Sequence, residues 1–323
     1  MLDGATADDL SGKTAAGKLG SGGAVRARLT GLWSDSRAGR WCRDRQLAER
    51  LRAWWEGYEF VARTPAPRAK AAERTEPVLI PTVNGWPAPR LEIVQTLFGE
   101  GMTAPAAEGT MVKMIHPLGL NEKMTVVELG AKLGGLARVV AQETGAYVTG
   151  FEPDETLAKA GMDLSTKLGL ARKAIIKQAA ATSLDVRPKS VDAILAREAI
   201  WTIEDKTALF GAIRKALKPG GQVMLSDVVL AGDAPGPAVA AWAAKEPQKG
   251  YLVPITAVRA AIEQLGLQVS IVEDVTAEFR SAAIAAFANL AERMASGAIS
   301  ERMCPWAICE GELWSARLAL LDS

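Results

Sequence analysis

Residues 126–135 read V-V-E-L-G-A-K-L-G-G, and Glu152 follows 22 residues after the first glycine, in the stretch V-T-G-F-E-P of residues 148–153. This pattern predicts a buried strand, a glycine turn that opens a helix, and a second strand ending in a carboxylate. Such a turn lets a ligand approach the backbone at a helix N-terminus, and the carboxylate can accept hydrogen bonds from both ribose hydroxyls. The stretch therefore predicts an adenosine-binding site.

The composition is that of a globular protein. The chain has 323 residues, of which 49% are hydrophobic, and a net charge of +1, so we expect a substantial core and no nucleic-acid partner. Cys42, Cys304 and Cys309 lack metal-ligand spacing, which predicts reduced thiols and no metal site. The first residues do not resemble a secretory signal, and no stretch reaches the roughly 18 apolar residues of a membrane span. We therefore expect a cytoplasmic protein without a transmembrane segment.

The sequence divides into three regions. Residues 1–36, rich in small and polar residues, are expected to form a flexible leader. Residues 37–90 are expected to hold an amphipathic helix at 41–61 and then a linker with six prolines after position 61. Residues 91–323 are expected to form a Rossmann-like domain with C-terminal helices.

The expected helix 41–61 carries an aromatic stripe that includes Trp54, Trp55 and Tyr58. Two interpretations are open: the stripe docks on the core, or it closes over a substrate cation, as aromatic rings do for ammonium groups. The segment is also locally basic, which fits either a solvated face or the binding of an anionic partner.

From residue 90 onward, apolar periodicity alternates between the strand and the helix type. Alternating elements of this length predict an α/β fold: a Rossmann-like, doubly wound, mostly parallel sheet with helices on both faces, plus an added N-terminal helical segment. The expected strands are 124–129, 147–151, 174–178, 191–196, 221–228 and 268–274. The expected helices are 90–99, 104–116, 134–143, 154–168, 204–217, 254–265, an amphipathic segment from Phe279 to Met294, and 309–320.

Four blocks in this order resemble a class I S-adenosylmethionine-dependent methyltransferase of the small-molecule type. They are the turn of residues 128–135, the acid Glu152, the strand V-D-A-I-L-A with R-E-A after it at 191–199, and L-K-P-G-G at 217–221. In the last block a proline and two glycines stop a helix and turn the chain into a strand.

The resemblance implies methyl transfer by in-line displacement at the sulfonium of S-adenosylmethionine to a small-molecule acceptor, with orientation and exclusion of water as the protein's main contribution. The implied cofactor-binding residues are Glu128, Gly130, Lys132, Gly134, Glu152 and Arg197. The candidate bases are Glu198, Asp227 and Tyr58, whereas the single histidine, His116, precedes a proline at a helix end and is assigned a structural role.

Structural interpretations of three acids are also open. Glu128 can complement the dipole of the following helix, Glu198 can cap the helix 204–217, and Asp227 can simply end a strand at the solvent. The three acids are therefore candidates for either role.

Two departures from the family pattern support a second hypothesis. Lys132 stands where the turn commonly has glycine, and an ammonium about 5 Å from a sulfonium costs roughly 3 kcal/mol at an effective dielectric near 20, unless it points away. The stretch 178–183 also lacks the acid that often binds the adenine amino group, although Gln178 or a backbone carbonyl can replace it. The alternative function is thus a catalytically degenerate fold, a pseudoenzyme serving as a scaffold subunit, joined to other chains through the N-terminal helix or an open sheet edge.

Overall fold

The computed structural model describes residues 85–106, 108–180, 182 and 184–322. The expected leader, the helix 41–61 with Tyr58, and nearly all of the proline-rich linker lie outside these residues.

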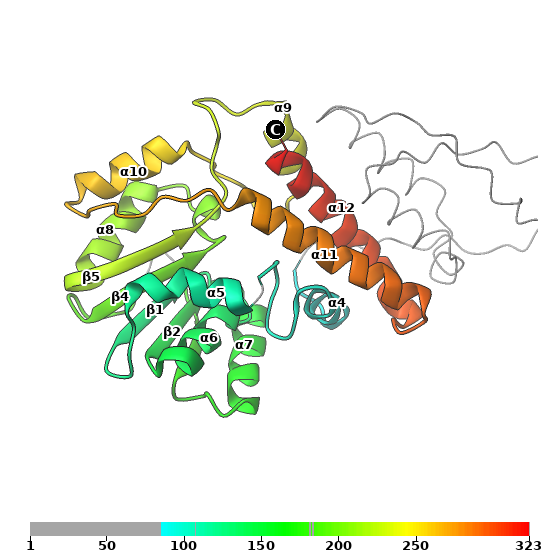
Figure 1. Cartoon of the computed structure of the whole chain (residues 1–323), viewed down its shortest axis with the longest axis horizontal. Helices are drawn as coiled ribbons and strands as arrows, with labels where there is room; N and C mark the ends of the chain where they lie inside the picture. The colour runs from blue at the N-terminus through cyan, green and yellow to red at the C-terminus, as the bar shows by residue number, and fades with distance from the viewer. Residues whose placement is uncertain (1–84, 107, 181, 183, 323) are drawn as a thin grey trace, which may run out of the picture.

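The centre of the fold is a five-stranded sheet in the order β3-β2-β1-β4-β5, in which every neighbouring pair is parallel (Figure 1). This confirms the predicted Rossmann-like sheet and the first five predicted strands. The strands are β1 (Thr125–Leu129), β2 (Tyr147–Glu152), β3 (Ala174–Gln178), β4 (Val191–Arg197) and β5 (Leu217–Ser226).

Successive apolar residues of the inner strands face opposite sides of the sheet, so that each side has its own core. Val126 packs in a cluster with α5 (Glu108–Ile115), α6 (Gly135–Thr144) and α7 (Glu155–Lys167). Val127 packs in a second cluster with α8 (Lys206–Ala216) and α10 (Ile255–Gln264). Because side chains alternate along a strand, both faces are buried by helices, as the sequence predicts.

The L-K-P-G-G block forms an irregularity inside β5. Leu217 pairs with Val191, but the next pair joins Gln222 to Ala193, so residues 218–221 bulge out of the ladder. Gly220 has a φ of 76°, which an L-residue adopts only with strain. The predicted sharp turn is therefore present, although the strand already begins at Leu217 instead of after the glycines.

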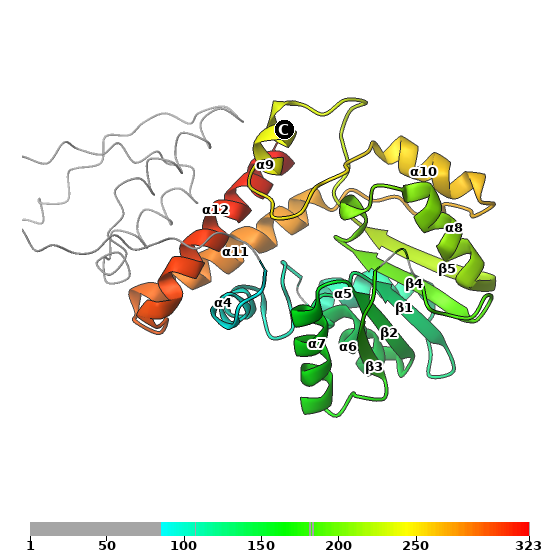
Figure 2. The same ribbon diagram turned by 180° about the vertical axis from the view of Figure 1, so that it is seen from behind.

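A second group of helices lies beyond the carboxyl ends of β4 and β5 (Figures 1 and 2). It has its own core, in which Phe98 packs against Trp314 with ring centroids 5.0 Å apart. A buried ion pair of 2.6 Å between Arg90 and Glu310 lies in the same group. Its helices are α4 (Ala88–Phe98), α9 (Pro237–Ala243), α11 (Thr276–Ala295) and α12 (Cys304–Leu321).

Four sequence-based expectations need correction. Residues 268–274 form no strand, because they have no ladder partner and leave Ile271 and Val272 more than half exposed. Helix α9 was not predicted within the stretch rich in alanine, glycine and proline. Helix α5 begins at Glu108, four residues later than predicted, and ends at Ile115, where a 3-10 turn at His116–Leu118 follows. Cys304 is disulfide-bonded, contrary to the expectation of reduced thiols.

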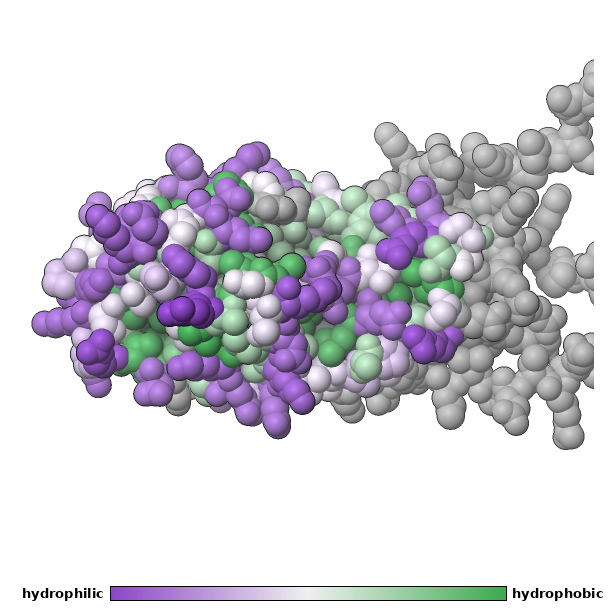
Figure 3. All heavy atoms as spheres, turned by 90° about the horizontal axis from the view of Figure 1, so that it is seen from below, coloured by the Kyte–Doolittle hydropathy of each residue, from purple (hydrophilic) through white to green (hydrophobic). Residues whose placement is uncertain are grey.

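Within the part of the chain that the structure describes, no helix has the length and apolar character needed to span a membrane. On the face seen from below, hydrophilic residues are distributed among smaller hydrophobic areas (Figure 3).

Candidate active site

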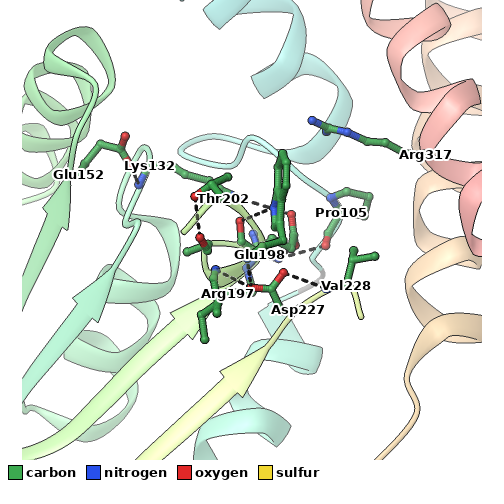
Figure 4. Close-up of polar contacts among 12 residues, drawn as sticks. Pro105, Lys132, Glu152, Arg197, Glu198, Thr202, Asp227, Val228 and Arg317 are labelled. Atoms are coloured by element: carbon green, nitrogen blue, oxygen red, sulfur yellow. Dashed lines mark hydrogen bonds and ion pairs between the residues drawn. The ribbon is translucent and has the colours of Figure 1, made fainter. Parts of the chain in front are cut away.

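The strand order reverses between β1 and β4, and the turns that follow these two strands face each other. In open parallel sheets a ligand binds in the crevice at this reversal, outside the carboxyl ends of the strands. Most of the residues predicted for the cofactor and the chemistry lie here, at the ends of β1, β2, β4 and β5 (Figure 4).

The glycine turn after β1 needs its glycines for two different reasons. Gly130 has a φ of 63°, and a Cβ placed on it would lie 2.5 Å from the Cβ of Ala199, in the turn after β4. The two turns are thus too close for any side chain at this position. Gly134, the N-cap of α6, has a left-handed φ of 73°, and a Cβ placed on it would lie 2.6 Å from Cδ1 of Ile176.

Glu152 binds the glycine turn to the end of β2. Its Oε2 accepts a hydrogen bond of 2.7 Å from the backbone N–H of Lys132, and its Oε1 accepts one of 2.9 Å from Asp154. Burial raises the pKa of this carboxyl, and the two backbone donors oppose that rise. Each carboxylate oxygen has two lone pairs, so both can accept a second hydrogen bond from a ligand hydroxyl.

Glu128 is the most deeply buried acid of the site, with 3% of its surface exposed. Burial raises its pKa to about 8, and the charges of Arg197 and Arg138 only partly oppose the effect. Its Oε2 has no hydrogen-bond partner among the described residues. A buried polar oxygen without a partner is costly, and a polar ligand group in the crevice would satisfy it.

Lys132 and Glu198 form an ion pair between the two facing turns. The Nζ of Lys132 lies 3.2 Å from Oε2 of Glu198, and Arg197 Nη1 lies 3.4 Å from Oε1 of the same carboxylate. Burial acts to raise the pKa of Glu198, but the Lys132 and Arg197 charges hold it below its usual value. Arg197 also donates to the carbonyl oxygen of Pro105 over 3.1 Å. Glu198 is therefore an ionised carboxylate at the mouth of the crevice.

Asp227, directly after β5, organises the turn that follows β4. Its Oδ2 accepts hydrogen bonds from the backbone N–H groups of Ile200 and Trp201, and its Oδ1 accepts one from Val228 (Figure 4). Burial raises its pKa to about 6, against the effect of these donors. The carboxylate is thus occupied by backbone groups, and its role as a base is still a prediction.

The structure brings together the predicted residues Glu128, Lys132, Arg197 and Glu198, whose charges interact with one another, and links Glu152 to Lys132 through the backbone. Tyr58 lies outside the described residues.

Two charged residues of this region were missed. Arg138, in α6, donates to the carbonyl oxygen of Leu133 under the glycine turn, and its charge interacts with Glu128. The sequence did indicate this residue, because Arg138 lies on the apolar, buried side of its helix. Arg317, in α12, stacks over Trp314 and forms a bidentate ion pair with Glu246 near Glu198. No local pattern marks Arg317, because only the packing of α12 brings it to this site.

Comparison with known proteins identifies the family. Residues 106–270 match the methyltransferase domain family, and the chain belongs to it. This confirms the class I S-adenosylmethionine-dependent resemblance, and S-adenosylmethionine is the cofactor of the family.

Among curated proteins, phosphoethanolamine N-methyltransferase 3 of Arabidopsis thaliana is 28% identical over 186 residues, which are 57% of this chain and 37% of that protein. Phosphoethanolamine N-methyltransferase 2 of Caenorhabditis elegans is 27% identical over 139 residues, 42% of this chain and 31% of that protein. The chain thus spans about a third of the length of these relatives.

Solved structures confirm the fold. Phosphoethanolamine N-methyltransferase 2 of Haemonchus contortus, in complex with S-adenosyl-L-methionine, superposes with a TM-score of 0.62 at 19% identity, covering 72% of this chain and 54% of that chain. A putative sarcosine dimethylglycine methyltransferase from Galdieria sulphuraria superposes with a TM-score of 0.54 at 16% identity, covering 66% of this chain and 77% of that chain.

The residues of the crevice fit this cofactor. The unpartnered Oε2 of Glu128 is available to a polar group of the ligand, and the oxygens of Glu152 can accept further hydrogen bonds from ribose hydroxyls. The positive charge of Lys132 is paired with Glu198. This pairing answers the expectation that the Lys132 ammonium repels the sulfonium of the cofactor.

Proposed function

We propose that this chain binds S-adenosylmethionine in the crevice between the turns after β1 and β4 and transfers its methyl group to a small-molecule acceptor. The observation that carries the proposal is the placement of Glu152, whose carboxylate holds the glycine turn while keeping acceptor capacity. When bound, the cofactor supplies a methyl group on a positively charged sulfur.

The chain's own part in this reaction is to orient and to exclude water. Glu152 would accept hydrogen bonds from the ribose, and the carboxyl group of Glu128 would form one with the cofactor deeper in the crevice. The helices α4, α11 and α12 lie beyond the carboxyl ends of the strands, where they would cover the mouth of the site (Figure 1). Much of the rate enhancement of such a displacement comes from holding the acceptor in line with the methyl group and from excluding water.

We place the acceptor beside Glu198. This carboxylate is ionised, and its side chain is only 13% exposed, so it can hold an ammonium group. Its lowered pKa makes it a weak acceptor of the ammonium proton, and its role as a base is still a prediction. An amine acceptor such as phosphoethanolamine is the first to test, because curated relatives carry that name. Asp227 is proposed to act through the turn it organises, and a role for Tyr58 is still a prediction.

The scaffold hypothesis has less support, since the charge of Lys132, one of the two departures that motivated it, is held in an ion pair. The other departure, the lack of an acid in the stretch 178–183, still stands. Two further expectations still stand as predictions. They are the division into a leader at 1–36, a helix and linker at 37–90 and a domain at 91–323, and oligomers formed through the N-terminal helix or the sheet edge.

A direct test is the formation of S-adenosylhomocysteine from S-adenosylmethionine in the presence of a panel of small amines that includes phosphoethanolamine. The proposal predicts acceptor-dependent product with the full chain and a loss of about a hundredfold or more in Glu152→Ala, because removing a buried polar partner costs on the order of 1 to 3 kcal/mol per hydrogen bond lost. Product formation that is unaffected by Glu152→Ala would overturn the assignment of the site.

A further inference from the structure

Glu198 has a backbone conformation that its surroundings must hold in place. Its φ is 51°, a left-handed conformation that is strained for a residue with a Cβ and persists only where neighbouring groups fix it. Its N–H donates to the carbonyl oxygen of Ser226 over 2.7 Å, and its own carbonyl oxygen accepts a hydrogen bond of 3.1 Å from Nε1 of Trp201. The direction of the Glu198 side chain therefore depends on these two hydrogen bonds.

Trp201 is itself held by a second tryptophan. The ring of Trp242, in α9, lies edge-on to that of Trp201 with centroids 5.2 Å apart. The backbone of Gly250 fits against both indoles, because a Cβ placed on it would lie 2.5 Å from Trp242 Cη2 and 3.3 Å from Trp201 Cε3. The next residue, Tyr251, donates its backbone N–H to the carbonyl oxygen of Trp201 over 2.7 Å. The indole of Trp201 is thus fixed beside the carbonyl of Glu198.

The contacts continue to helix α12. Nε1 of Trp242 donates to Oε1 of Glu246 over 2.7 Å, and Arg317 of α12 donates to both oxygens of the same carboxylate over 2.6 and 2.9 Å. The side chain of Glu246 is 1% exposed, so this junction is shielded from water. A continuous set of contacts therefore joins helices α9 and α12 to the residue that is proposed to hold the acceptor.

We propose that Trp201 and Trp242 are positioning residues for the methyl acceptor. They hold the backbone of Glu198 in its left-handed conformation and thereby keep its carboxylate at the mouth of the crevice. The cofactor residues Glu128 and Glu152 lie outside this set of contacts, so the two tryptophans act on the acceptor and not on the cofactor. This inference rests on the proposed function and adds to it the residues that determine where the acceptor is held.

The pKa of Glu198 reports the position of its carboxylate without any ligand. Burial acts to raise this pKa, but the charges of Lys132, Arg197 and Arg317 hold it below its usual value, and Asp227 is the neighbouring acid. A carboxylate that turns away from these cations loses their stabilisation, so its pKa rises. An NMR titration of isotope-labelled glutamate side chains measures it in the full chain, with the Glu198 signal identified by its loss in Glu198→Gln.

Trp201→Phe removes the N–H donor but keeps an aromatic ring against Trp242. The pKa of Glu198 should rise in this variant. The KM for the amine that the chain methylates should rise about tenfold, the size of one hydrogen bond, while the Kd of S-adenosylhomocysteine is unchanged. Trp314→Phe is the matched control, because it removes a buried indole N–H that has no partner among the described residues. It should change none of the three quantities.

Gly250→Ala tests the tryptophan pair from the other side, since the added methyl must push the two indoles apart. It should act in the same direction as Trp201→Phe, whereas Gly232→Ala, at a glycine with open space around it, should have no effect. Equal thermal unfolding of the variants shows that the fold is intact, and Trp201→Phe decides if Gly250→Ala does not fold.

Two results of the titration would overturn the inference. One is a Glu198 pKa in Trp201→Phe that equals the wild-type value, and the other is an equal rise in Trp314→Phe. Failure of the proposed function looks different: the wild-type chain would then bind no S-adenosylhomocysteine and methylate no amine, while the titration would still decide whether Trp201 positions Glu198.

Discussion

The backbone N–H of Lys132 and the carboxylate of Glu152 are joined by a hydrogen bond of 2.7 Å, which fixes the glycine turn to the end of the second strand. The same lysine reaches Glu198 through its side chain. One residue thus connects the turns after β1 and β4 and the end of β2, so that the geometry of the crevice depends on it.

Gly130→Ala is expected to destabilise the chain by about 2 to 5 kcal/mol, because it combines the strain of a left-handed residue with overpacking against Ala199. Gly169→Ala is the matched control, since Gly169 has a φ of 73° and open space around it, and should lose only about 1 to 2 kcal/mol. Urea unfolding monitored by circular dichroism measures both. Equal losses would show that the approach of the two turns is looser than described.

Glu128→Gln is expected to change how stability depends on pH. The folded chain keeps a proton on Glu128 up to a pKa of about 8, whereas the unfolded chain releases it near 4.5. The folded state therefore binds more protons between these values, and the wild-type free energy of unfolding falls relative to the variant as pH rises through this interval. The slope is at most about 1.4 kcal/mol per pH unit.

Unfolding of both proteins at pH 5, 6, 7 and 8 gives this difference directly. The free energy of unfolding of the wild type, relative to that of Glu128→Gln, should fall with each step and become constant above pH 8. A difference that stays constant across the series would mean that Glu128 titrates as an ordinary exposed acid.

The buried pair Arg90–Glu310 is expected to be costly to break. Arg90→Met leaves the carboxylate of Glu310, which is 2% exposed, without its cation, and should destabilise the chain by about 3 to 5 kcal/mol. Combining it with Glu310→Leu removes the stranded charge and should restore most of the loss.

The exposed pair Arg259–Glu263 is the control for this effect. Arg259→Met should cost less than about 1 kcal/mol, as surface ion pairs do, measured by the same denaturant titration. If Arg90→Met lowers the free energy of unfolding by no more than Arg259→Met does, the Arg90–Glu310 pair does not behave as a buried ion pair.

The sheet and the cofactor crevice could be predicted because their signals are local. The glycine turn at 130–135 and the acid at 152 carry their strand and helix signals within a few residues, and parallel strands bring their carboxyl ends together. The same reasoning identified Glu128, Arg197 and Glu198 as neighbours of one crevice.

Tertiary packing decided the features that sequence reasoning missed. The segment 268–274 has the β-branched and apolar residues of a strand, but a strand forms only where a partner edge completes the ladder. The Lys132–Glu198 pair joins residues 66 positions apart and depends on two left-handed backbones, which no local pattern shows. The lysine was therefore interpreted as an obstacle to the cofactor, whereas its charge is paired.

The most direct test of the account is isothermal titration calorimetry of the full chain with S-adenosylhomocysteine. We expect a Kd in the micromolar range for the wild type, abolished in Glu152→Ala and retained in Glu155→Ala, which removes a neighbouring exposed acid at the start of α7. The absence of heat at millimolar ligand, or equal binding by all three proteins, would contradict a cofactor site at the turn after β1.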